Sequence, residues 1–305
     1  MLGAHLQKRG VNVPLKSRPD HSSVGRIAGA LSAAMLLVAC SGSEKLVPRA
    51  MTESLKADLQ VVASSRVYFG HQSVGGNIMD GLADLQSQLP EPTVRVGELG
   101  SLDISGDQPV LLHTAIGENS KPVSKCQDFR RILATRLDGR VDVALFKFCY
   151  IDFNDRTDVR SVFETYATTM NELKLKYPGI VFIHVTAPLR SVDRGLGVWV
   201  REMLGRTNRT KLANVRRNEF NRLLRETYPD EPVFDLEAAM STYPDGRRET
   251  FSMDGTVYYS LVPAYTDDGG HLNSVGRTHA AADLVHSIAD AVRAHGRHLD
   301  STPTA

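Results

Sequence analysis

The sequence predicts an α/β fold in which a mainly parallel sheet is covered by helices on both faces. Short apolar strands alternate with longer segments in which apolar residues recur every three to four positions, and this alternation is typical of a doubly wound sheet. Residues 141–151 form a nearly continuous apolar run, as expected for a parallel strand with helices on both sides. Ligands of such sheets bind at the carboxyl ends of the strands, so candidate sites are sought there.

The elements follow one another in a regular order. We expect strands at 66–69, 93–96, 141–151, 180–186 and 233–236, and helices at 53–62, 75–89, 159–173, 211–228 and 274–295. The last helix is expected to begin at a Ser or Asn cap and to stop at Gly296. Asp254 and Gly255 predict a hairpin turn inside 241–267, which is the segment we expect to set substrate specificity.

Composition and charge exclude several classes of protein. With 42% apolar, 7% aromatic and 23% charged residues in 305, the chain is neither disordered nor a multi-span membrane protein. Residues 1–39 hold five basic residues against one acidic residue, which leaves 31 basic and 34 acidic residues in the rest. A slightly acidic body lacks the basic face that nucleic acid requires, so we expect no nucleic-acid partner.

The amino-terminal segment is typical of an export signal. Residues 27–39 are an uncharged apolar run after Arg26, too short to span a bilayer, which takes about 20 residues. The run ends in Leu37-Val38-Ala39-Cys40, which resembles the lipobox of bacterial lipoproteins, where the cysteine is lipidated. We expect a signal peptide at 1–39, a tether at 40–52, one domain at 53–298 and a disordered tail at 299–305.

The lipobox resemblance implies a place for the protein. A lipid on Cys40 would anchor it to a bacterial membrane on the extracytoplasmic side, and Ser41 after that cysteine resembles outer-membrane sorting. The alternatives are an ordinary signal peptide and a buried helix that a cysteine happens to follow.

Two further cysteines, Cys126 and Cys149, remain if Cys40 is lipidated. A disulfide between them and two buried free thiols are both compatible with the sequence. No Cys or His cluster has the spacing of a zinc site, so we expect no metal and no cofactor.

A serine lies in the turn between the first strand and the next helix, in Gly70-His71-Gln72-Ser73-Val74-Gly75-Gly76. A hydroxyl there would lie at the carboxyl edge of the sheet, beside a helix amino terminus that favours a developing oxyanion. Ser73 is therefore a candidate nucleophile. The alternatives are a plain helix cap and a phosphate-binding turn, although neither glycine-rich phosphate motif is present.

A second motif, Asp268-Gly269-Gly270-His271, lies just before the last helix. Its carboxylate can accept a hydrogen bond from one imidazole nitrogen and leave the other nitrogen free to act as a base. An acidic loop followed by a helix-end histidine is the alternative interpretation.

Together the two motifs resemble the SGNH (GDSL-type) hydrolase superfamily over residues 63–295. The resemblance implies a three-layer α/β/α sandwich with a flavodoxin-like sheet, and a triad of Ser73 as nucleophile, His271 as base and Asp268 as the residue that orients it. It also implies an esterase, or an acyltransferase that uses the same residues. The usual Gly-Asp-Ser opening is altered here to Gly70-His71-Gln72-Ser73.

The remaining family blocks are less well matched. The Gly-x-Asn-Asp block falls on Cys149-Tyr150-Ile151-Asp152, where only the Asp is kept, so the oxyanion hole needs other donors. We assign it to the Ser73 amide with Gly117 and Asn119; Gly97 and Gly100 are alternatives, and a plain surface turn at 117–119 is another.

We therefore expect a serine esterase that acts on a small-molecule or polysaccharide ester. O-acetyl groups of a cell-envelope glycan are the hypothesis for its substrate. His71, Tyr150 and Asp152 are the expected substrate contacts, although a structural role fits His71 equally well. A non-catalytic glycan-binding lipoprotein is the third hypothesis, because the first and third blocks are altered.

Overall fold

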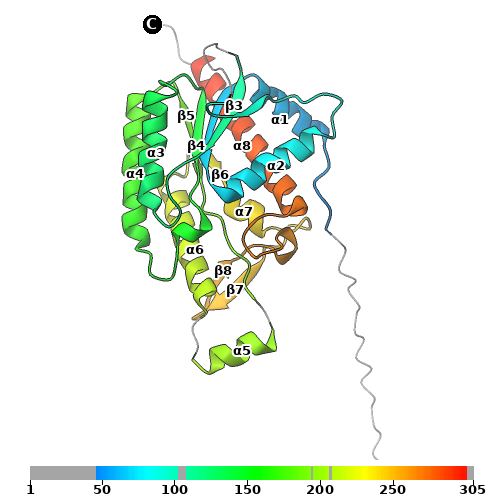
Figure 1. The fold of residues 1–305 in the computed structure, drawn as a ribbon, viewed down its shortest axis with the longest axis vertical. Helices are drawn as coiled ribbons and strands as arrows, with labels where there is room; N and C mark the ends of the chain where they lie inside the picture. The colour runs from blue at the N-terminus through cyan, green and yellow to red at the C-terminus, as the bar shows by residue number, and fades with distance from the viewer. Residues whose placement is uncertain (1–45, 102–107, 194, 206–207, 301–305) are drawn as a thin grey trace, which may run out of the picture. The chain divides into compact units, whose positions relative to one another are not determined.

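A six-stranded sheet lies at the centre of the computed structural model, which describes residues 46–101, 108–193, 195–205 and 208–300 (Figure 1). Each pairing between its neighbouring strands is parallel. The order is β2-β3-β1-β4-β5-β6, from β1 (Arg66–His71), β2 (Val96–Glu98), β3 (Val110–Ala115), β4 (Val143–Phe146), β5 (Val181–Val185) and β6 (Val233–Phe234).

Without the edge strand β2, the strands occur in the order 2-1-3-4-5, which is the flavodoxin-like arrangement. The order reverses between β1 and β4, so a crevice is expected at the carboxyl ends of these two strands. The predicted α/β/α fold is confirmed.

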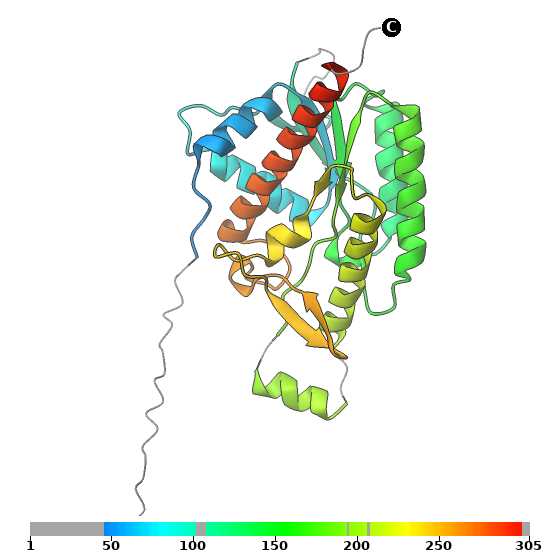
Figure 2. The same cartoon turned by 180° about the vertical axis from the view of Figure 1, so that it is seen from behind.

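Helices cover both faces of this sheet (Figures 1 and 2). One face carries α1 (Glu53–Ala63), α2 (Ser73–Gln86), α7 (Leu236–Ser241) and α8 (Ser274–Asp300), and the other carries α3 (Pro122–Thr135), α4 (Val159–Lys176) and α6 (Arg209–Thr227). Alternate strand residues supply the two cores: Val67 and Phe69 of β1 join the first, and Tyr68 joins the second.

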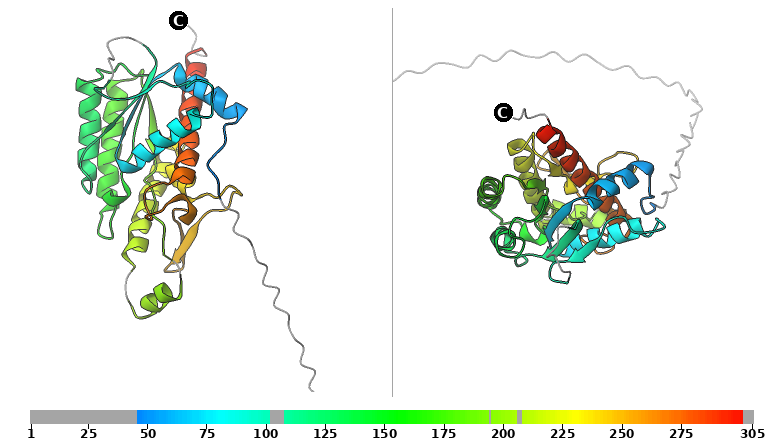
Figure 3. Two further views of the ribbon diagram at one scale, coloured as in Figure 1. Left: turned by 45° about the vertical axis from the view of Figure 1, so that its right-hand side comes forward. Right: turned by 90° about the horizontal axis from the view of Figure 1, so that it is seen from above.

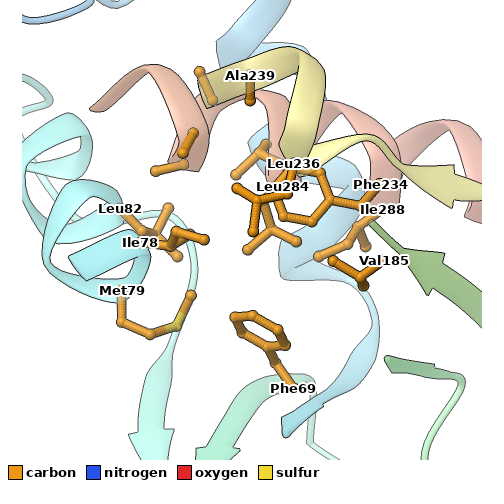
Figure 4. Close-up of a cluster of buried hydrophobic side chains, with 14 of the residues drawn as sticks. Phe69, Ile78, Met79, Leu82, Val185, Phe234, Leu236, Ala239, Leu284 and Ile288 are labelled. Atoms are coloured by element: carbon orange, nitrogen blue, oxygen red, sulfur yellow. The ribbon is translucent and has the colours of Figure 1, made fainter. Parts of the chain in front are cut away.

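The first core cluster joins α2, α7 and α8 to the sheet (Figure 4). Ile78 and Leu82 of α2 converge there on Leu284 and Ile288 of α8, and all four are fully buried. Because α2 starts with Ser73 and α8 starts just after His271, this packing holds the two predicted motifs in a fixed relation. Residues Lys45–Ala305 form one compact unit.

The structure differs from the sequence prediction in the region after α2. Strand β3 was not predicted, because His113 and Thr114 interrupt its short apolar run, and α3 was not predicted, because it is rich in polar residues. The predicted strand 93–96 is instead β2, a three-residue edge strand. The run 141–151 is a strand only as far as Phe146 and ends in the 3₁₀ turn η1 (Tyr150–Asp152).

Two local predictions, a hairpin turn and the end of the last helix, had different outcomes. The hairpin exists: β7 (Thr250–Met253) pairs antiparallel with β8 (Thr256–Tyr259), and both Asp254 and Gly255 have positive φ, 50° and 76°, as a two-residue hairpin turn requires. The predicted stop at Gly296 is wrong, because α8 continues to Asp300. Asn273 caps its start by accepting from the Val275 and Gly276 amides at 3.1 and 3.2 Å.

Candidate active site

Ser73 is the first residue of α2, directly after the carboxyl end of β1. Gln72, between them, has extended backbone, and its Nε2 donates to the carbonyls of Ile116 and Gly117 at 2.9 Å each. These bonds fix the β1–α2 turn to the loop that follows β3. Ser73 is exposed, and among the described residues neither its hydroxyl nor its amide has a hydrogen-bond partner. Both groups are therefore available to a ligand at a helix amino terminus.

The predicted dyad is present in the loop between η2 (Pro263–Tyr265) and α8. His271 Nδ1 lies 2.5 Å from Asp268 Oδ2, and Asp268 Oδ1 accepts from the Gly270 and His271 amides at 2.8 Å each. The hydrogen bond from the His271 side chain, assisted by these amides, holds the pKa of Asp268 well below its usual range. An ionised carboxylate at Nδ1 keeps the proton on that nitrogen, so Nε2 is the basic one.

A hydrogen bond connects this loop with α2. Asn77 lies four residues after Ser73, one helical turn further along the same face, and its Oδ1 accepts from the Leu272 amide at 3.1 Å. His271 therefore lies beside the first turns of α2. Asn77 was not predicted from the sequence, although its i,i+4 spacing from Ser73 is a signal that could have identified it.

Tyr150 forms the next wall of the site, from η1 after β4. Its hydroxyl lies 3.4 Å from His271 Nε2, and the two rings meet edge to face with centroids 5.6 Å apart. Gly270 lies under the Tyr150 ring so closely that a Cβ there would be 2.9 Å from the ring. Burial raises the pKa of Tyr150, so its hydroxyl stays protonated and donates to Nε2. The structure thus brings this predicted substrate contact to the dyad.

Arg190 was not predicted and lies in the same wall. Its guanidinium is 5.3 Å from the centroid of the Tyr150 ring, and its Nε and Nη2 donate to the Gly269 and Asp268 carbonyls at 3.3 and 3.4 Å. Arg190 therefore braces the dyad loop from the segment that follows β5.

His71, the expected substrate contact, has a structural role instead. Its ring is buried, Nε2 lies 3.1 Å from His113 Nδ1, and Nδ1 lies 3.2 Å from the Gln72 carbonyl. Burial lowers the pKa of His71 to about 3, so the ring is neutral. It fills the space under the first turn of α2, where a Cβ on Gly75 would lie 2.3 Å from it.

Asp152, also expected at the substrate, lies inside the protein. One carboxylate oxygen accepts from the Cys149 amide at 2.7 Å, and the other accepts from the Ser120 amide and from Lys125 Nζ at 2.9 Å each. Asp152 and Lys125 have fully buried side chains. This carboxylate therefore joins the ends of β4 and β3 and does not face a ligand.

The predicted oxyanion donors are also corrected in part. The Gly117 amide donates to Asp128 Oδ2 at 2.9 Å, so it is occupied within the protein. Asn119 is exposed in the following turn, and no described residue bonds to it. Of the three predicted donors, the Ser73 amide has no partner among the described residues, the Gly117 amide is occupied by Asp128, and the role of Asn119 stays a prediction.

The cysteine alternative left open by the sequence is also decided, because Cys126 and Cys149 are both buried free thiols. Cys40 lies outside the described residues. Within those residues, no three His, Cys, Asp or Glu side chains gather as a metal-binding group. No helix in the described ranges is long and apolar enough to cross a bilayer.

The chain matches no family model and no curated protein sequence. It is similar in structure to a lipase/acylhydrolase from Enterococcus faecalis, with 16% identity, coverage of 74% of this chain and 96% of the other, and a TM-score of 0.42. For a lipolytic protein of the G-D-S-L family from Desulfitobacterium hafniense, these values are 10%, 73%, 98% and 0.40. For the periplasmic domain of a lipopolysaccharide acetyltransferase from Salmonella ser. Paratyphi A, they are 10%, 78%, 90% and 0.40.

Proposed function

We propose that this chain is a serine ester hydrolase of the SGNH type, with Ser73, His271 and Asp268 as its triad. The observation that carries the proposal is the Asp268–His271 dyad, which is tied through Asn77 to α2, the helix whose first residue, Ser73, has no hydroxyl partner among the described residues. The site lies at the carboxyl ends of β1 and β4, where the strand order reverses.

The mechanism follows from these groups. His271 Nε2 takes the Ser73 proton as Ser73 Oγ attacks the ester carbonyl, and the Ser73 amide at the start of α2 stabilises the oxyanion. The C–O bond to the alcohol then breaks, and the alcohol leaves with the proton from His271. Water attacks the acyl-enzyme with His271 again as base, which releases the acid and restores Ser73. Tyr150 gives up its bond to Nε2 when Ser73 takes that position.

The exposure of the dyad favours hydrolysis over transfer to another alcohol. The side chains of His271 and Asp268 are 41% and 55% exposed, so water reaches the acyl-enzyme freely. An acyltransferase must exclude water from this step. Transfer to a sugar hydroxyl is therefore the second candidate.

The compartment and substrate form the second part of the proposal. The apolar run before Cys40 supports an extracytoplasmic lipoprotein, and such an enzyme meets envelope glycans, so O-acetyl groups on a glycan are the proposed substrate. Labelling with a palmitate analogue tests the anchor: the label is expected on the full chain and lost in Cys40→Ser. Label retained by the variant would exclude Cys40.

A fluorophosphonate probe followed by intact-mass measurement tests the triad. We expect one adduct on Ser73 and none in Ser73→Ala or His271→Ala. Both substitutions are expected to lower kcat/KM on a soluble acetyl ester by about 10³-fold or more, because members of a triad fail together.

Matched controls come from the same chain. Ser87→Ala changes an exposed serine at the other end of α2, and His286→Ala changes a histidine paired with Asp58 and Asp290 away from this site. Both are expected to label and react normally. A folded protein that does not label would exclude the proposal and favour glycan binding without catalysis, whereas acyl transfer to an added sugar exceeding hydrolysis would favour the transferase.

A further inference from the structure

Arg190 brings a positive charge to the candidate site. It lies in the segment between β5 and α5 (Leu196–Met203), at the end of the sheet beyond which α5 and the β7–β8 hairpin lie (Figure 3). Its guanidinium donates to the backbone carbonyls of Gly269 and Asp268. Within the described ranges, its Nη1 has no hydrogen-bond partner. The side chain is partly exposed and Nη1 is not buried, so a ligand can reach this nitrogen.

The neighbouring carboxylates do not neutralise this charge. Asp268 uses its carboxylate oxygens for the Gly270 and His271 amides and the His271 ring. Asp193, on the same segment as Arg190, is exposed and is not paired with it. Among the residues that the structure describes, no Asp or Glu oxygen lies within ion-pair distance of the Arg190 guanidinium. An anionic ligand would therefore be its first acidic partner.

One tyrosine ring separates the Arg190 charge from the dyad. The guanidinium lies 5.3 Å from the centroid of the Tyr150 ring, and the hydroxyl of that ring lies 3.4 Å from His271 Nε2. An ester whose carbonyl lies beside His271 would thus reach Arg190 with a group about one six-membered ring away from the ester.

A second guanidinium lies behind the same wall. Arg217 of α6 is 3% exposed, and its acceptors, at 2.6–3.1 Å, are the carbonyls of Tyr150 and Phe153 and the side-chain oxygen of Asn214. The Asn214 oxygen also accepts from the Arg190 amide at 3.1 Å, so it joins the two arginines. Burial, together with the nearby charge of Arg190, lowers the pKa of Arg217 to about 9, so Arg217 is still charged at neutral pH.

This arrangement favours an anion over a neutral group. All the acceptors of Arg217 are neutral oxygens, so its charge adds to that of Arg190. A hydrogen bond from a guanidinium to a carboxylate is roughly twice as strong as one between neutral groups, and partial burial strengthens it further. The planar guanidinium also matches the shape of a carboxylate.

We propose that Arg190 binds a carboxylate of the substrate, so that the preferred ester carries this group about one ring away from its acyl oxygen. In a glycan, an O-acetylated uronic acid has this arrangement, because the pyranose ring separates the carboxylate from the ester. The inference rests on the proposed function, since it names the substrate class of the same triad. Arg217 does not touch the substrate in this proposal and acts as a positioning residue for Tyr150.

Two aryl acetates of the same shape test the proposal. In 4-acetoxybenzoate a benzene ring separates the ester from a carboxylate, and in 4-acetoxybenzamide a neutral amide replaces that carboxylate. We expect kcat/KM to be at least tenfold higher for the benzoate at low salt, mainly through a lower KM. This preference should shrink in 0.5 M salt, which screens the charges.

Arg190→Gln is expected to lower the ratio of the two kcat/KM values at least tenfold, whereas Arg190→Lys, which keeps the charge, is expected to retain a preference for the benzoate. Arg222→Gln is the matched control, because Arg222 is an exposed arginine of α6 already paired with Glu226 at 2.7 Å, and it should keep the parent ratio. An arginine that only braces the dyad loop would lower both values by the same factor. That result, or equal values in the parent, would overturn the proposal.

A binding measurement separates this inference from the proposed function. Ser73→Ala is titrated with each uncleaved ester by NMR, and the Kd for the benzoate is expected to be at least tenfold lower than for the benzamide. Ser73→Ala combined with Arg190→Gln should lose this difference. Equal affinity of Ser73→Ala for both esters would refute the carboxylate site. Failure of the parent to hydrolyse either ester would count against the proposed function, and the two Kd values would still decide whether Arg190 binds a carboxylate.

Discussion

At the scale of single residues, the candidate site depends on one short polar contact. Asp268 accepts three hydrogen bonds from Gly270 and His271, so its negative charge is stabilised by donors of its own loop. The orientation of the imidazole and the location of its proton both follow from this carboxylate. A substitution that removes the negative charge of Asp268 but keeps the shape of its side chain is therefore the most specific test of this contact.

We predict that Asp268→Asn lowers kcat/KM by about 10²- to 10⁴-fold, because an amide no longer imposes the tautomer with a basic Nε2. The measurement is steady-state kinetics on a soluble acetyl ester. Asp267→Asn is the control, since within the described ranges that neighbouring carboxylate accepts only from Asn273, at 3.2 Å, and the substitution is expected to change kcat/KM less than threefold. Full activity in Asp268→Asn would contradict the triad.

The pH profile adds a second check on the same residue. Because the pKa of Asp268 is held well below its usual range by the bond from His271, the carboxylate stays ionised through mildly acidic pH. Asp268 therefore contributes no proton of its own to an acid-side loss of kcat/KM at mildly acidic pH. We expect one proton, not two, to account for this limb in a plot of log kcat/KM against pH.

At the scale of elements, the start of α2 combines a reactive position with a tight packing constraint. Two adjacent glycines in its first turn have opposite surroundings: a Cβ on Gly75 would lie 2.3 Å from the His71 ring, and a Cβ on Gly76 would meet nothing within 4 Å. The close approach of Gly75 to His71 sets where the helix, and hence Ser73, begins.

We predict opposite effects for these two glycines. Gly76→Ala should raise the free energy of unfolding by up to about 1 kcal/mol, because alanine favours the helix. Gly75→Ala should lower it by about 1–3 kcal/mol through overpacking, and should also reduce labelling of Ser73. Urea unfolding and probe labelling of both variants measure this, and equal stability of the two would disprove the packing argument.

The loop beside α3 depends on the buried pair Lys125–Asp152. Removing one partner leaves an uncompensated buried charge, so Lys125→Met is predicted to lower the free energy of unfolding by about 3–5 kcal/mol. In Lys121–Glu118, on the same segment, the side chains are 64% and 68% exposed, and Lys121→Met should change stability by less than about 1 kcal/mol. Chemical denaturation compares the two, and a similar small loss in both would show that the buried pair is not needed.

At the scale of the whole molecule, two buried histidines make the fold sensitive to acid. Burial lowers the pKa of His71 to about 3 and that of His184 to about 4, whereas the unfolded chain titrates near 6.5. Below pH 6.5 the unfolded state therefore binds protons that the folded state does not, and stability falls as pH falls toward 4.

We predict that the free energy of unfolding declines between pH 6.5 and pH 5 by up to about 1.4 kcal/mol per pH unit for each histidine. Urea unfolding at several pH values measures the slope. Between pH 7.5 and pH 8.5 neither histidine changes charge in either state, so their contribution should be flat. A flat curve down to pH 5 would mean that these rings become charged without unfolding.

Much of the architecture was predictable because hydrophobic periodicity reports burial directly. The strands around 66–71 and 181–185 and the helices α2, α4, α6 and α8 were predicted, and their order implied the parallel sheet. Strand β3 was not, because a six-residue strand containing His113 and Thr114 has no clear pattern. Its existence depends on pairing with β1, which lies far from it in sequence, and with the short preceding strand β2.

The sequence by itself determined the dyad, because Asp268 and His271 are three residues apart in one turn and local geometry suffices for their contact. Only the tertiary structure decided which polar groups remain free for a ligand. The Gly117 amide donates to Asp128, the His71 ring is hydrogen-bonded to His113, and the Asp152 carboxylate accepts from Lys125. Each of these partners comes close only when a loop or strand folds, because no fixed local spacing in the sequence joins the two residues. In the folded chain these polar groups are therefore occupied, whereas the Ser73 hydroxyl has no partner among the described residues.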